Sequence, residues 1–356
     1  MRYIVCMLAL CSVLTVRAQS VELPEALMDA VPEGTEEFLD EEAAADTPDL
    51  SGGIQSIFQH MRQRAGGILH QRLRGAVQIL LVVFLCGLVE SGAANEKTAL
   101  FLPMVGALSI TALTVGSLDS LLGLGSETIR NLSSFARVLL PILAAAAAAA
   151  GGWTVSTVHQ VAAVFFVNLL FQMIDRLLLP LTGLYIGLLT AGACLQDGRL
   201  TALADGLKKI ITWVLCTALF LFTGYLSAAR ILTGPADSAA VKLTKSALSG
   251  VVPVVGSIIA EAAETVLAGA GLLKGAIGIF GVLTVLAACA YPFLQLGIQY
   301  ILYKITAFLS TVLGVPGLCK LIGGLGGAFG LVLGMTGSCA LLLLISVLSS
   351  AAAVVT

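Results

Sequence analysis

Long apolar stretches dominate this sequence and constrain its fold more than any other feature. A helix of about 20 mostly apolar residues is long enough to cross the hydrocarbon core of a membrane. The sequence repeats such stretches from residue 76 almost to its end. It therefore predicts an all-α, polytopic helical membrane protein. The apolar stretches lie at roughly residues 76–91, 98–116, 137–152, 155–174, 177–195, 209–229, 276–296, 299–318 and 327–353.

Several of these stretches are short, so the number of spans depends on where breaks are placed. The stretches on either side of Gly151-Gly152 could form one broken unit, and Pro180 could turn 155–195 into a tight helical hairpin. We predict about seven transmembrane helices, within a range of six to nine, plus interfacial amphipathic helices.

Composition supports a membrane protein and excludes other classes. Apolar residues other than glycine make up 58% of the 356 residues, and charged residues only 11%. Soluble domains carry about 25% charged residues, so a water-soluble globule would lack the polar groups to cover its surface. The net charge of −2 gives no basic footprint for nucleic acid, and we expect no nucleic-acid partner.

The first 53 residues have a different character. Residues 1–18 carry Arg2, a short apolar stretch and a small-residue pattern ending at Ala18, which predicts a cleaved signal peptide. An uncleaved first anchor is the alternative. Residues 19–53 hold eleven of the 21 acidic residues and no Lys or Arg, so we expect an acidic flexible segment.

The rest of the chain divides into four predicted parts. Apolar residues at helical spacing alternate with arginines over 54–74, which predicts a basic amphipathic helix in the headgroup region. A first transmembrane group covers 75–235. An amphipathic or re-entrant helical pair covers 236–275, and a C-terminal transmembrane group covers 276–356.

Polar residues within the apolar region are candidate site residues, because a charge in mid-bilayer is costly and should face protein or water. In one apolar segment they lie at helical spacing and mark either a membrane edge or a polar seam that lines a cavity or a subunit contact. These residues are Asn168, Gln172, Asp175 and Arg176.

The 236–275 region carries a second polar set. Lys242 and Lys245 share one face of a predicted helix, and Glu261 and Glu264 share one face of the next. We expect these side chains to face water or a partner, because two carboxylates inside a membrane span would be costly. The non-helical backbone between the two helices must then be shielded by protein. A proton or cation site at the two glutamates is the alternative.

Glycines four residues apart predict close helix packing, because small side chains let two helices approach. The packing lies within the chain or between chains. The candidate glycines are Gly183, Gly187, Gly326, Gly330 and Gly334.

Motifs of known enzymes are missing from the sequence. It has no P-loop, no H-E-x-x-H zinc motif and no G-x-S-x-G nucleophile elbow, and it has three histidines in all. The eight cysteines form no C-x-x-C pair and mostly lie within apolar stretches. We therefore predict no enzyme activity, no catalytic or metal-binding residues and no cofactor.

Two blocks of sequence resemble a known family. One runs from Lys242 through Gly256 and Glu261 to Gly275. The other runs from Phe165 through Asp175-Arg176 to Gly183. Both, with the order of signal-like start, acidic segment, basic helix and multispan region, resemble the stage III sporulation protein AE family.

This resemblance implies a role in endospore formation. It implies a multi-pass protein of the mother-cell membrane around the forespore, within a secretion-like channel complex needed for the activity of the late sigma factor G. The implied partners are membrane lipid and the other stage III A-operon proteins, including a secretion-type ATPase and ring-forming subunits. The forespore stage II sporulation protein Q would take part indirectly.

A second function class stays open from the residues alone. The chain could act by itself as a membrane transporter or ion channel, with Asp175, Arg176, Glu261 and Glu264 along the pathway.

Overall fold

The computed structural model describes residues 24–32, 35, 50–92, 96–149, 155–251, 256–313 and 315–352, and these parts of the chain are helical with short connections. The expected all-α fold is therefore confirmed. The elements are α2 (Glu25–Met28), α4 (Leu50–Gly92), α5 (Glu96–Ala149), α6 (Val155–Met173), the π-helix η2 (Ile174–Leu178), α7 (Leu179–Leu195), α8 (Gly198–Val251), α9 (Gly256–Val312) and α10 (Pro316–Ala352).

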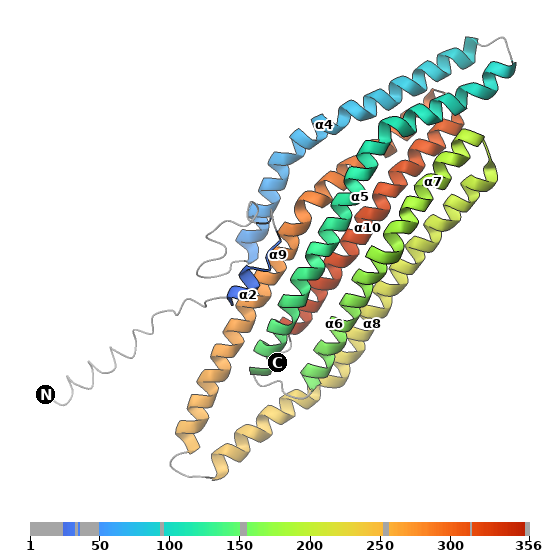
Figure 1. The fold of residues 1–356 in the computed structure, drawn as a ribbon. Coiled ribbons are helices and arrows are strands. Elements are labelled where there is room, and N and C mark those ends of the chain that lie inside the picture. Colours follow the sequence, from blue (N-terminus) through green and yellow to red (C-terminus); the bar gives the residue numbers. More distant parts are fainter. Residues whose placement is uncertain are drawn as a thin grey trace.

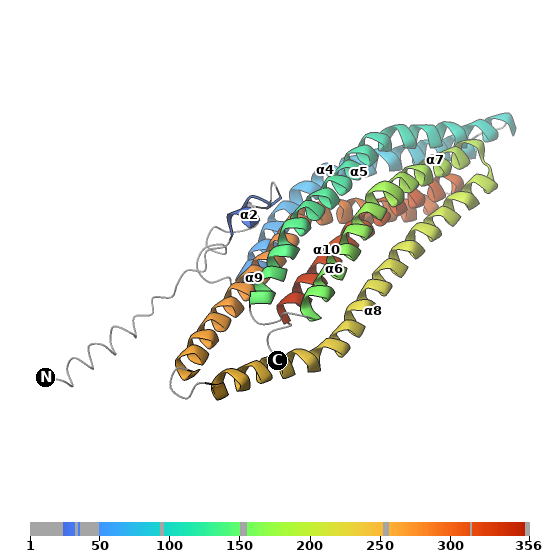
Figure 2. The same cartoon turned by 60° about the horizontal axis from the view of Figure 1, so that its bottom comes forward.

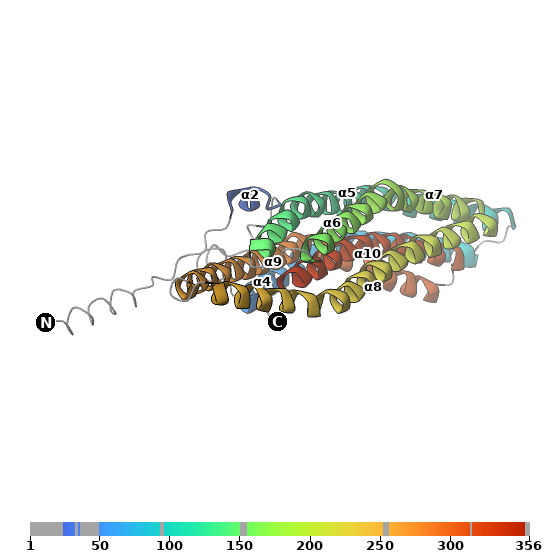
Figure 3. The same cartoon turned by 90° about the horizontal axis from the view of Figure 1, so that it is seen from below.

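The long helices run side by side and form an elongated bundle (Figure 1). Helix α10 lies in its middle and packs on α9, α5 and α7, while α4 lies against α9 and α5. The lower ends of α8 and α9 extend beyond the other helices (Figures 1 and 2). Seen from below, α5, α6 and α7 form one layer, and α8, α9 and α10 form the other (Figure 3).

Six helical segments in the described part of the chain are long and apolar enough to span a membrane, which agrees with the predicted range. The division into spans was partly wrong. The stretch at 98–116 and the described part of 137–152, up to Ala149, lie on the single helix α5, and 276–296 continues in α9 up to Val312. The six segments are Gly52–Ser91, Phe101–Ala146, Val164–Leu195, Gly198–Tyr225, Gly275–Val312 and Pro316–Leu348.

Helix length explains this difference. Helix α5 has 54 residues. At 1.5 Å per residue it is about 80 Å long, more than twice the thickness of a hydrocarbon core. Charged residues between two apolar stretches therefore need not end the helix, because part of a helix this long lies outside the hydrocarbon.

The segment 155–195 is not a hairpin. Helices α6 and α7 follow one another along one line and are joined by the π-helix η2 (Figure 1). Pro180 lies in the first turn of α7. Its ring would clash with the carbonyl of Arg176, four residues earlier, in a regular α-helix. The wider π-turn accommodates the proline without reversing the chain, and the N–H of Leu179 bonds the carbonyl of Ile174.

The N-terminal predictions fall partly outside the described residues, and the signal peptide lies there entirely. Within the segment expected to be flexible, α2 is one helical turn, and the side chain of Leu27 is fully buried. Helix α2 contacts α5. Burial of Leu27 therefore holds α2 against the bundle.

The basic helix predicted at 54–74 is the first half of α4 and continues directly into the first span. Ile57 packs against Leu283 and Ala287 of α9. The Arg72 Nη2 atom donates a hydrogen bond to Gln295 Oε1 at 3.2 Å. This segment is therefore continuous with the first span and packs on another helix, while its place in the headgroup region stays a prediction.

Large apolar side chains cover much of the outer surface. Only 17% of the apolar window in Gly198–Tyr225 is buried, against 67% in Gly275–Val312. Soluble monomers rarely expose such continuous apolar surface. Lipid is the environment that suits these outer faces, which include Val77, Leu81, Phe84, Leu88, Phe101, Val105, Leu108, Trp213, Phe220, Ile301, Phe308 and Val312.

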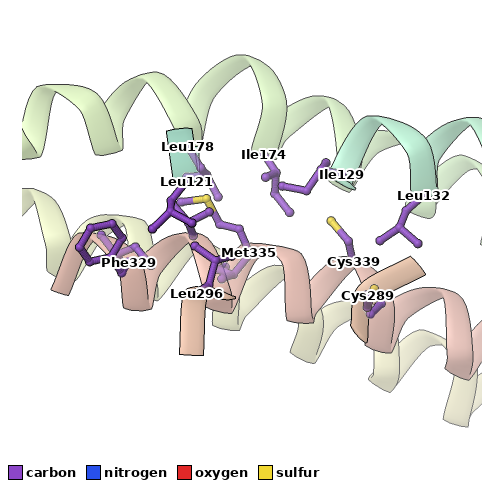
Figure 4. Close-up of a cluster of buried hydrophobic side chains, with 14 of the residues drawn as sticks. Leu121, Ile129, Leu132, Ile174, Leu178, Cys289, Leu296, Phe329, Met335 and Cys339 are labelled. Carbon is purple, nitrogen blue, oxygen red and sulfur yellow. The ribbon is translucent and has the colours of Figure 1, made fainter. Parts of the chain in front are cut away.

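In the described part of the chain, most buried apolar residues form one large core, and a smaller cluster lies between α4 and α9. Figure 4 shows Leu121, Ile129 and Leu132 of α5 facing Met335 and Cys339 of α10. Cys86, Cys289, Cys319 and Cys339 are buried free thiols, as expected for small apolar residues.

Glycines of α10 allow close contact with its neighbours. A Cβ atom at Gly326 would lie 2.9 Å from the Cβ of Tyr303, and one at Gly330 would lie 2.9 Å from the ring of Tyr300. At Gly334 the nearest atom is 3.8 Å away, which is ordinary contact. At Gly183 and Gly187 nothing lies within 4 Å, so packing there stays a prediction for a contact outside this chain.

We predict that Gly326→Ala lowers the thermal unfolding midpoint of the purified protein in detergent, whereas Gly183→Ala leaves it equal or higher. Both changes gain about 1 kcal/mol of helix propensity. Only the first inserts a methyl group into a packed contact, at a cost of about 1–3 kcal/mol. Equal shifts of the two midpoints would contradict the close packing of α9 on α10.

Candidate functional site

The π-helix η2 places Asp175 and Arg176 at the junction of α6 and α7. Ile174 and Leu178 of the same turn are fully buried and anchor η2 in the core. Single π-turns inside α-helices occur frequently at functional sites. The neighbouring polar residues of η2 point away from the core toward α5 and the surface.

Asp175 forms an ion pair with α5. Its Oδ1 atom accepts a hydrogen bond from Arg130 Nε at 3.2 Å and another from Ser126 Oγ at 3.3 Å. The Arg130 side chain is 69% exposed and that of Asp175 is 28% exposed. The predicted seam residue therefore pairs with a residue 45 positions earlier in the chain.

An open groove of about 310 Å³ surrounds this pair. Helix α5 contributes one wall, and the end of α6 with η2 contributes the other. The lining residues are Ile129, Arg130, Ser133, Ser134, Arg137, Phe171, Gln172, Asp175 and Arg176. Three arginines against one carboxylate give the groove an excess of two positive charges.

The structure brings together three of the four residues predicted on this segment. Gln172, Asp175 and Arg176 line the groove. Asn168 does not, because its Nδ2 atom donates a hydrogen bond to the carbonyl of Val164 in its own helix, at 3.0 Å.

Sequence reasoning missed the α5 wall of the groove. Arg130, Ser134 and Arg137 are spaced by four and three residues and are all exposed. The residues between them, such as Leu132 and Phe135, are buried. This amphipathic spacing is visible in the sequence and could have identified the polar face, although not its partner on η2.

A second polar cluster lies where α7, α8 and α9 meet α10, and sequence reasoning missed it as well. Its Tyr185 is buried, its Lys208 is half-buried and its Lys304 is exposed. The Tyr185 hydroxyl donates to the Gly324 carbonyl at 2.9 Å, and Lys304 Nζ donates to the Gly323 carbonyl at 3.4 Å. Lys208 Nζ lies 2.8 Å from where a Cβ atom of Gly327 would be. Glycines here make room for polar side chains.

The other predicted polar residues are described only by their backbone. Lys242 and Lys245 belong to the last part of α8, and Glu261 and Glu264 belong to the first part of α9. The predicted pair of helices thus forms the adjoining ends of two long helices. Its role as a partner contact stays a prediction.

No group of three or more His, Cys, Asp or Glu side chains in the described part of the chain is placed to hold a metal ion. The groove itself offers donors, from guanidinium, hydroxyl and amide groups, and a single carboxylate. Such a set is suited to binding an anion.

Comparison with known proteins identifies the family. The sequence model of the family described as stage III sporulation protein AE matches residues 43–353, which is most of the chain. The chain belongs to this family. The resemblance expected from the sequence is therefore confirmed.

A relative in this family is the stage III sporulation protein AE of Bacillus subtilis (strain 168). It is 24% identical over 263 residues, which cover 73% of this chain and 65% of the relative. The chain thus spans less than two thirds of the relative's length. No solved structure matches this chain.

The family is named for a stage of sporulation and not for an enzymatic reaction. Several helices able to span a membrane, with apolar outer faces, make this member a membrane protein.

We predict that the core side of η2 matters more for stability than its ion pair. Leu178→Ala should lower the free energy of unfolding by about 2–5 kcal/mol, because it leaves a cavity in the core. Arg130→Gln should change it by no more than about 1 kcal/mol, because the pair is exposed. Denaturant unfolding in detergent measures both, and an equal loss in the two variants would contradict this assignment.

Proposed function

We propose that this protein is a non-enzymatic integral component of a secretion-like channel complex that links the mother cell and the forespore. The observation that carries the proposal is the family match over residues 43–353, in a chain whose outer helix faces are apolar. In this role the protein lies in the mother-cell membrane around the forespore. It supports the late activity of sigma factor G in the forespore.

The shape of the bundle suits a part of a larger assembly. Helices α8 and α9 have 54 and 57 residues, which correspond to about 81 and 86 Å, so they extend well beyond a hydrocarbon core. Their adjoining ends carry Lys242, Lys245, Glu261 and Glu264. We assign these ends to contacts with other stage III A-operon proteins, among them a secretion-type ATPase and ring-forming subunits, with the forespore stage II sporulation protein Q reached indirectly.

The lack of nucleotide-binding and catalytic motifs supports a structural role. A transport complex needs an energy source, and in this proposal a separate ATPase subunit supplies it. This chain then contributes membrane anchoring and helix contacts.

One observation favours the alternative of an autonomous transporter or ion channel. Lys208 is half-buried beside Gly327 and the Tyr185 hydroxyl, in a segment able to span a membrane, and ionisable groups within membrane spans often mark transport pathways.

We expect tagged protein from sporulating cells to co-purify with the operon's ring and ATPase subunits, because its role is assembly. The charge-reversed variant Lys242→Glu, Lys245→Glu should lose these subunits. The matched variant Arg62→Glu, Arg64→Glu on α4 should keep them, since it changes charge equally at a distant site. Both variants should still reach the membrane.

The same purified protein in liposomes distinguishes the two functions. An assembly component shows no ion or solute flux above that of empty liposomes. Reproducible flux without any partner, abolished by Lys208→Met, would contradict the proposal and establish the transporter.

A further inference from the structure

The groove between α5 and η2 has an excess of positive charge that its lining residues do not neutralise. Its only carboxylate, Asp175, is engaged by Arg130 and Ser126. Among the residues that the structure describes, Arg137 and Arg176 have no carboxylate within 4.0 Å. Two guanidinium groups therefore face one open groove without a counter-charge.

The remaining donors converge on the same space. Ser133 and Ser134 of α5 contribute hydroxyl groups, and Gln172 of α6 contributes a side-chain amide. Guanidinium groups bind phosphate oxygens with parallel hydrogen bonds, and hydroxyl or amide donors can bind the oxygens that remain. A volume of about 310 Å³ is at the lower limit for small-molecule pockets, so it suits a headgroup better than a large ligand.

Exposed apolar residues continue directly from the groove along α6. Phe165 and Leu169 precede Gln172 and Arg176 at spacings of three to four residues, and all four side chains are exposed. They therefore share one outward face of the helix. A molecule with an anionic end and an apolar tail would fit this face, with its anionic end at the arginines and its tail along Leu169 and Phe165.

We propose that the groove binds the phosphodiester headgroup of an anionic phospholipid, with Arg137 and Arg176 on the phosphate and an acyl chain along Leu169 and Phe165. Basic pockets between membrane helices bind anionic headgroups in this manner. The site depends only on the protein lying in a membrane, so it can fail or succeed independently of the sporulation role.

The test measures lipid retained by the full-length protein. Protein is loaded with equal amounts of phosphatidylglycerol and phosphatidylcholine of the same chain length and washed in detergent, and bound lipid is quantified by mass spectrometry. Wild type should retain phosphatidylglycerol in preference to phosphatidylcholine. The Arg137→Gln, Arg176→Gln variant should retain at least about fivefold less phosphatidylglycerol, the factor that a single arginine contributes near an anionic surface.

A matched control separates this site from general charge attraction. Arg199→Gln, Lys209→Gln removes the same charge from exposed positions of α8 and should retain phosphatidylglycerol like wild type. All three proteins should have the same thermal unfolding midpoint. Equal loss of lipid in the two variants would overturn the proposal.

Radiolabelled inorganic phosphate distinguishes the source of the anion. Delipidated wild type in equilibrium dialysis should bind little phosphate, because the acyl chain contributes to the lipid's affinity. Arginine-dependent phosphate binding without preferential lipid retention would overturn the lipid assignment. So would an acidic polypeptide that co-purifies only when Arg137 and Arg176 are present.

Discussion

The contact between apolar side chains and lipid is the interaction on which this structure depends. The outward faces of α4, α5 and α8 carry residues such as Leu81, Phe101 and Phe220, which are exposed in the folded chain. Monomers that are soluble in water rarely expose so large an apolar surface. In lipid, exposing the same faces costs no free energy. Small residues and polar groups then serve the contacts between helices.

Inside the bundle, shape and polarity replace the hydrophobic driving force, because lipid tails are as apolar as leucine. Helix α10 is central because its glycines admit Tyr303 and Tyr300 of α9 and Lys208 of α8. The bundle's backbone carbonyls satisfy polar side chains such as Tyr185. Within the part of the chain that the structure describes, Arg137 and Arg176 are not satisfied in this way, and they line the groove beside η2.

The sequence was sufficient to predict the fold class, the family and part of the groove. Apolar stretches predicted membrane helices, and helical spacing placed Gln172 and Arg176 on one face. It was not sufficient for the helix boundaries, because charged residues are compatible with an 80 Å helix that leaves the hydrocarbon. The pairing of Asp175 with Arg130 was also unpredictable from spacing, since it depends on how α5 lies against η2.

Fluorescence of Trp213 tests the lipid contact most directly. Its side chain is 68% exposed on α8, and Trp153→Phe leaves it as the only tryptophan of the chain. In liposomes with brominated acyl chains, we expect strong quenching of Trp213 and little quenching by acrylamide in the surrounding water. Full quenching by acrylamide, with none by brominated lipid, would contradict the account.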